Sequence, residues 1–81
     1  MRLKENIVLQ DKGYSGILFD TISEDFFELD QIGIYILKYL TGKKEYQEKI
    51  LSEYDIQRDE LNLEIINFKN VLLEKEIIEN D

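Results

Sequence analysis

The pattern of hydrophobic and polar positions changes once along the chain, near Asp30. Before Asp30 the apolar residues form short runs separated by polar turns, which is typical of strands. After Asp30 they recur every three or four residues, which is typical of helices. No linker or internal repeat divides the sequence. We therefore expect one α+β domain over residues 1–81, with the strands first and the helices second.

Three short apolar runs predict three β-strands, at about residues 7–10, 16–20 and 25–29. Short strands joined by polar turns are typical of an antiparallel meander. In the third run, side-chain alternation puts Phe27 and Leu29 on one face of the sheet, and Phe26 and Glu28 on the other.

Helical spacing predicts three helices, at about residues 31–41, 43–54 and 58–75. Asp30 is suited to cap the first helix, because its carboxylate can accept hydrogen bonds from the free amides of the first turn. Gly42 is suited to end that helix. The inward positions of the first helix are expected to be Ile32, Tyr35, Ile36, Tyr39 and Leu40.

The third predicted helix carries two apolar stripes. The first consists of Leu61, Ile65, Phe68 and Leu72, and it is the expected core contact. Ile66 and Leu73 lie about 100° around the helix from it and must cover something else. A wider core contact, a dimer surface and the wall of a groove all fit this second stripe. In the last case, Asn62 and Lys69 lie on the rim.

The composition excludes most kinds of catalytic and metal chemistry. The chain has no cysteine, which excludes disulfides, thiolate metal sites and a cysteine nucleophile. It also has no histidine, so the commonest general base and the commonest metal ligand are missing. We expect a protein without catalytic residues, metal or cofactor.

The charge balance limits the possible partners. Ten basic residues are scattered among eighteen acidic ones, for a net charge of −8. Because phosphate backbones are bound by clusters of Lys and Arg, nucleic acid and anionic membranes are poor partners. The N-terminus lacks a signal-like apolar stretch, and the longest uncharged runs, of which Gln31 to Leu37 is one, are too short to span a bilayer. We therefore expect a cytoplasmic protein.

Four segments together resemble the PqqD-like family, the RiPP recognition elements that bind leader peptides in pathways for ribosomally made, modified peptides. The segments are Ile17-Leu18-Phe19-Asp20; Phe26-Phe27-Glu28-Leu29-Asp30; the helix positions Gly33, Ile36, Leu37, Leu40 and Gly42; and Glu53-Tyr54-Asp55-Ile56 with Ile77-Ile78. The chain departs from the family pattern at three positions. Asp30 stands where Asn is usual, and Glu24 and Glu76 stand where glycine is common.

The resemblance implies a winged-helix-like fold. In that fold a leader peptide pairs with the third strand of the meander and packs into the cleft between that strand and the third helix. It also implies a non-catalytic module that presents a precursor peptide to a separate modifying enzyme, such as a radical-SAM protein or a leader protease. Pockets for alternate peptide side chains would supply specificity, since backbone pairing is largely blind to sequence. The expected peptide-binding residues are Asp25, Phe26, Phe27, Glu28, Leu29, Asn62, Ile66, Lys69, Asn70 and Leu73.

Two alternatives stay open at this point. A structural or dimerisation domain would use the same edge strand and the same apolar stripe for contact with a second copy. A winged-helix DNA-binding protein is less favoured. The third helix region has Arg58, Lys69 and Lys75 against five acidic residues, whereas a recognition helix presents basic side chains to phosphates.

Overall fold

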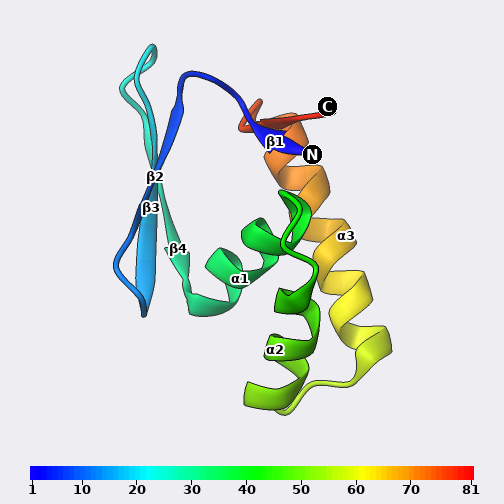
Figure 1. The fold of residues 1–81 in the computed structure, drawn as a ribbon. Helices are drawn as coiled ribbons and strands as arrows, with labels where there is room; N and C mark the ends of the chain where they lie inside the picture. The colour runs from blue at the N-terminus through cyan, green and yellow to red at the C-terminus, as the bar shows by residue number, and fades with distance from the viewer.

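The computed structural model describes residues 1–81 and shows the expected order of three antiparallel strands followed by three helices (Figure 1). The ends of these six elements differ from the predicted ones by at most two residues. Two further short strands were not predicted and pair the ends of the chain. The elements are β1 Arg2–Leu3, β2 Ile7–Asp11, β3 Ser15–Asp20, β4 Phe26–Asp30, α1 Gln31–Leu40, α2 Glu45–Glu53, α3 Arg58–Glu74 and β5 Ile78–Glu79.

The three-stranded sheet is an antiparallel meander in the order β2-β3-β4. Its inner face supplies one wall of the core, where Leu18 and Leu29 are buried. The predicted alternation in β4 is confirmed. Leu29 is buried and Phe27 half-buried on the inner face, whereas Phe26 and Glu28 are exposed on the outer face.

Helix α1 lies between the sheet and the other two helices (Figure 1). The Asp30 carboxylate accepts a hydrogen bond from the Gly33 amide at 2.8 Å, which confirms the predicted cap. The predicted apolar stripe was too narrow, because Ile34 and Leu37 are also buried. Helix α1 packs against the sheet on one side and against the other helices on the other, so it needs apolar residues on both sides. The predicted stripe allowed for only one of these contacts.

Helices α2 and α3 complete the core from the side opposite the sheet. Ile50 of α2 is buried, and so are Leu61, Ile65 and Leu72 on the predicted stripe of α3. Phe68, on the same stripe, is only half-buried. None of the three helices has the length and apolar character needed to cross a bilayer.

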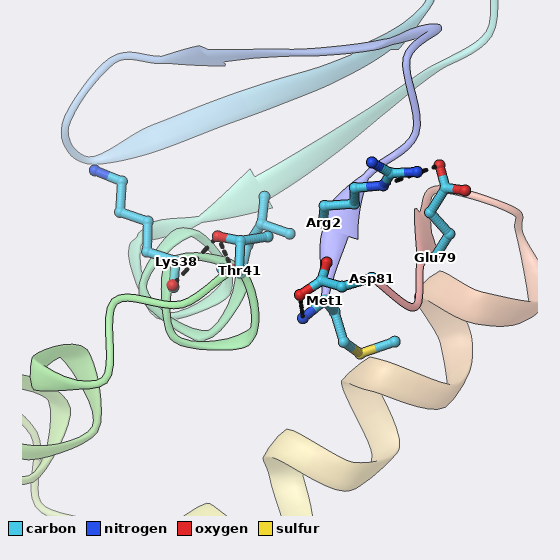
Figure 2. Close-up of polar contacts among 7 residues, drawn as sticks. Met1, Arg2, Lys38, Thr41, Glu79 and Asp81 are labelled. Carbon is cyan, nitrogen blue, oxygen red and sulfur yellow. Dashed lines mark hydrogen bonds and ion pairs between the residues drawn. The ribbon is translucent and has the colours of Figure 1, made fainter.

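The two ends of the chain meet in the small antiparallel sheet of β1 and β5. Leu3 lies opposite Ile78 in this ladder, and Ile78 is buried. Figure 2 shows two ion pairs beside it. The Met1 amino group lies 3.4 Å from the Asp81 carboxylate, and Arg2 lies 3.7 Å from Glu79. These contacts fix the C-terminal end of α3 to the N-terminal segment that leads into β2.

Candidate functional site

Strand β4 lies at one end of the sheet and pairs with β3 on one side only. The amide of Asp20 donates to the carbonyl of Asp25 across these strands. In an antiparallel ladder, hydrogen-bonded pairs alternate with non-bonded pairs. The register therefore puts Phe27 and Leu29 in bonded pairs, opposite Leu18 and Gly16 respectively.

The main-chain groups of Phe26 and Glu28 consequently point away from β3, toward the free edge. No hydrogen bond from another segment reaches the backbone of either residue. This is a row of unpaired donors and acceptors of the kind that takes up an additional strand. The opposite edge of the sheet is also open along much of β2, although the Ile7 amide donates to the carbonyl of Lys4 there.

A turn held by one carboxylate positions the start of β4. Asp20 accepts hydrogen bonds from the side-chain amide of Asn6 at 3.0 Å and from the backbone amides of Ile22 at 2.8 Å and Ser23 at 3.2 Å. These bonds, the one from Asn6 foremost, hold the pKa of Asp20 below its ordinary value. Asp20, the last residue of the first segment that resembles the family, thus fixes the loop that leads into β4.

On the inner face, one side chain from the C-terminal end of α3 reaches β4. The ammonium of Lys75 sits 5.2 Å from the centre of the Phe27 ring, a cation–π contact. At 100° per residue, Phe68 and Val71 lie within about 40° of Lys75 around the helix. The face of α3 turned toward β4 therefore carries these three residues. None of the three is among the peptide-binding residues expected from the sequence.

The predicted site residues of α3 lie on a different face. Asn62 accepts a hydrogen bond from Gln47 of α2 at 2.9 Å, so its side chain faces α2. Lys75 lies about 140° around the helix from Asn62, whereas Ile66, Lys69 and Leu73 lie within about 40° of it. Asn70 is exposed, about 80° from Asn62 on the same geometry.

Of the predicted site residues, Phe26 to Leu29 lie in the edge strand β4, Asp25 directly precedes it, and Asn62 faces α2. Leu73 packs against the core, and Ile66 is 53 % exposed. A helical wheel gives two flanks to the core stripe of α3, and the wheel alone does not say which flank faces the sheet. No group of His, Cys, Asp and Glu side chains comes together in a way that could hold a metal ion.

Comparisons with known proteins identify the family of the chain through a family model and its fold through solved structures. Residues 15–78 match the family model of coenzyme PQQ synthesis protein D (PqqD). The solved structure of TbiB1 in complex with the TbiA(beta) leader peptide is 23 % identical with a TM-score of 0.82, over 100 % of this chain and 98 % of that one. The structure of lasso peptide synthetase B1 complexed with the leader peptide is 21 % identical with a TM-score of 0.81, over 98 % of this chain and 96 % of that one.

At these identities the two structures show a shared fold. No curated protein matches the sequence. The family match runs from the start of β3 to the first residue of β5 and includes both β4 and α3. On the strength of that match, the chain belongs to the PqqD family.

Proposed function

We propose that this chain is a non-catalytic RiPP recognition element that binds the leader of a ribosomally made precursor peptide as an added strand on β4. The observation that carries the proposal is the unpaired edge of β4, with the amides and carbonyls of Phe26 and Glu28 directed outward. Family membership supports it, and so do the two similar folds, each of which is named for a complex with a leader peptide.

Energetics requires side-chain contacts as well as strand pairing. Ordering a flexible peptide costs about 1–2 kcal/mol per residue, and each strand hydrogen bond returns only about 0.5–1.5 kcal/mol. Buried apolar side chains of the peptide, at about 1.5–3 kcal/mol each, must supply the rest. A residue added opposite Phe27 would point inward, because facing residues share a side of the sheet. It would meet the Phe27 ring and displace Lys75 from it.

Delivery to a separate enzyme completes the proposal. The chain has no cysteine or histidine with which to modify a peptide itself. Its role is to raise the local concentration of the precursor beside a modifying enzyme, such as a radical-SAM protein or a leader protease. Since the precursor is made on ribosomes, we place this step in the cytoplasm.

The test is amide protection measured by nuclear magnetic resonance. The ¹⁵N-labelled protein is titrated with synthetic leaders of the precursor peptides encoded beside its gene. Slowed hydrogen exchange on binding is expected at the amides of Phe26 and Glu28. The amides of Phe27 and Leu29 already lie in the ladder and should change less. Failure of every such leader to bind, or protection confined to another surface, would refute the proposal.

The same edge is open to a second copy of the chain, which would make this a dimerisation domain. Sedimentation at the concentrations used for resonance measurements separates the two cases. Leader binding predicts a monomer that gains the mass of one peptide. Pairing through β4 predicts a dimer without leader, in which the amides of Phe26 and Glu28 are protected before any peptide is added.

A further inference from the structure

The outer face of the sheet, which points away from α1, carries a row of exposed apolar side chains. Val8, Phe19 and Phe26 lie opposite one another across the three strands. They are 52 %, 38 % and 61 % exposed respectively. The row ends at the free edge of β4, so the side chains of an added strand would continue it.

A hollow opens on the same face next to this row. Its volume is about 510 Å³, and its walls are formed by Lys12, Tyr14, Ser15, Gly16, Ile17, Glu28, Leu29 and Asp30. Ile17 and Glu28 face each other across the ladder, and alternation puts both on the side of Phe26. The hollow therefore borders the free edge two residues along β4 from Phe26.

The charges of the hollow favour a cation. The carboxylate of Glu28 has no hydrogen-bond or ion-pair partner in the structure, whereas that of Asp30 accepts from the Gly33 amide. Lys12 is the one basic residue among the lining residues, which include the two carboxylates of Glu28 and Asp30. The rings and methyl groups of Tyr14 and Ile17 offer an apolar surface for the stem of a long side chain.

We propose that the outer face is a second specificity surface for the bound peptide, and that the hollow beside Glu28 takes a lysine or arginine side chain of that peptide. The inference rests on the proposed function, because the peptide must first occupy the β4 edge. A peptide residue opposite Glu28 points to the outer face, where an opposite charge is the favoured cross-strand neighbour. The peptide residue opposite Phe26 points the same way and extends the apolar row.

The spacing of these contacts defines a sequence pattern. The two outward residues of the peptide are separated by one inward residue, which faces Phe27. If the added strand is antiparallel to β4, the pattern from the N-terminus is basic, inward apolar, outward apolar. A parallel strand reverses this order. Each cross-strand pair is expected to change affinity by up to about fivefold.

A display experiment tests the pattern with the full chain. A phage-displayed library of short random peptides is selected on the wild type and on the Glu28→Lys and Phe26→Ser variants, both altered at exposed positions. The wild type should enrich Lys or Arg two residues from an apolar residue. Glu28→Lys should enrich Asp or Glu at the basic position instead. Phe26→Ser should lose the outward apolar preference and keep the basic one.

Affinity measurements then isolate the charge. Replacing the selected basic residue of the peptide with alanine should weaken binding to the wild type by up to about fivefold. The same replacement should leave binding to Glu28→Gln almost unchanged. Selected peptides that protect the Phe26 and Glu28 amides but show no enrichment of Lys or Arg would contradict the proposed outer-face site. The same enrichment persisting with Glu28→Lys would contradict it as well. Either outcome refutes the outer-face site and leaves the proposed function standing. A selection that yields no peptide bound at the β4 edge counts against the proposed function itself.

Discussion

The ammonium of Lys75, just past the end of α3, lies 5.2 Å from the centre of the Phe27 ring in β4. This contact joins the end of the helix to the inner face of β4, the strand that has one unpaired edge. Because Lys75 covers the ring in the peptide-free chain, a peptide side chain that packs on Phe27 has to take its place. Lys75 therefore covers the apolar ring on which a side chain of the proposed peptide would pack.

Phe27→Ala should weaken leader binding strongly. Removing the ring takes away the inner apolar contact of the added strand, which is worth about 1.5–3 kcal/mol if fully buried, or more than tenfold in affinity. Calorimetric titration with a leader measures the change. Leu63→Ala on α3, where the side chain is 59 % exposed, is the matched control and should bind like the wild type. Equal affinities for the two variants would place the peptide elsewhere.

Lys75→Ala should have the opposite effect on binding. A cation–π contact at an exposed site is worth about 0.5–1 kcal/mol, and the peptide must break it. The variant should therefore bind leader up to about fivefold more tightly and unfold at a slightly lower denaturant concentration. Weaker binding would mean instead that the ammonium contacts the peptide directly.

Glu28→Pro should remove binding while keeping the fold. The amide of Glu28 faces the free edge, so proline at this position deletes an outward donor without breaking the ladder to β3. We expect about a tenfold loss of leader affinity from the lost hydrogen bond and the bulk of the ring. Glu28→Ala separates the effect of the side chain. Phe27→Pro deletes an amide that bonds to β3, so this variant should melt at a far lower temperature by circular dichroism. Similar melting curves for the two proline variants would contradict the assigned alternation of inward and outward amides in β4.

The order of elements could be predicted because the apolar period changes once and each segment has its own end signals. Asp30 caps α1 as expected, and Gly42, with a φ of 114°, ends the turn that follows. The pairing of β1 with β5 could not be predicted in the same way. Each strand has two residues, too few to show alternation, and the two strands come from opposite ends of the chain.

The two faces of β4 could be predicted from the sequence, whereas the orientation of α3 could not. Alternation alone assigns Phe27 and Leu29 to one face of β4, and the structure agrees. For α3, a wheel places Ile66 beside the core stripe, but three-dimensional packing decides which flank lies next to β4. The hydrogen bond from Gln47 to Asn62 shows that α2 takes that flank.

Glu76→Gly should stabilise the protein. The φ of Glu76 is 58°, in the left-handed region that glycine enters without steric cost, and the family commonly has glycine here. Relief of the strained backbone should raise the free energy of unfolding by about 0.5–1 kcal/mol. The greater flexibility of glycine in the unfolded chain offsets part of this gain. Urea denaturation measures it. Glu24→Gly, where φ is 66°, should act in the same direction. Gly42→Ala is the reverse test and should destabilise.

The ion pair between Lys38 of α1 and Asp11 of β2, 2.7 Å apart, should make stability depend on pH at both extremes. The hydrogen bond from Lys38, followed by one from the Gly13 amide, lowers the pKa of Asp11 below 3.8. The hydrogen bond to Asp11 likewise raises the pKa of Lys38 above 10.5. A lowered carboxyl pKa stabilises the fold above pH 3.8, and this stabilisation is lost as the pH falls through the folded-state value. A raised ammonium pKa stabilises the fold below pH 10.5 and is lost as the pH rises through its folded-state value.

The contribution of the pair should therefore be complete between these limits. Melting temperatures of the wild type and Lys38→Met should differ most within that window, and the difference should shrink below pH 3.8 as Asp11 takes up its proton. The Asp11→Asn variant completes a double-mutant cycle and keeps a side-chain oxygen for the Gly13 amide. In the Asp11→Asn background, Lys38→Met should have a smaller effect that no longer changes in acid. A difference that stays constant from neutral pH to well below pH 3.8 would show that the pair adds nothing to stability, which is common for exposed ion pairs.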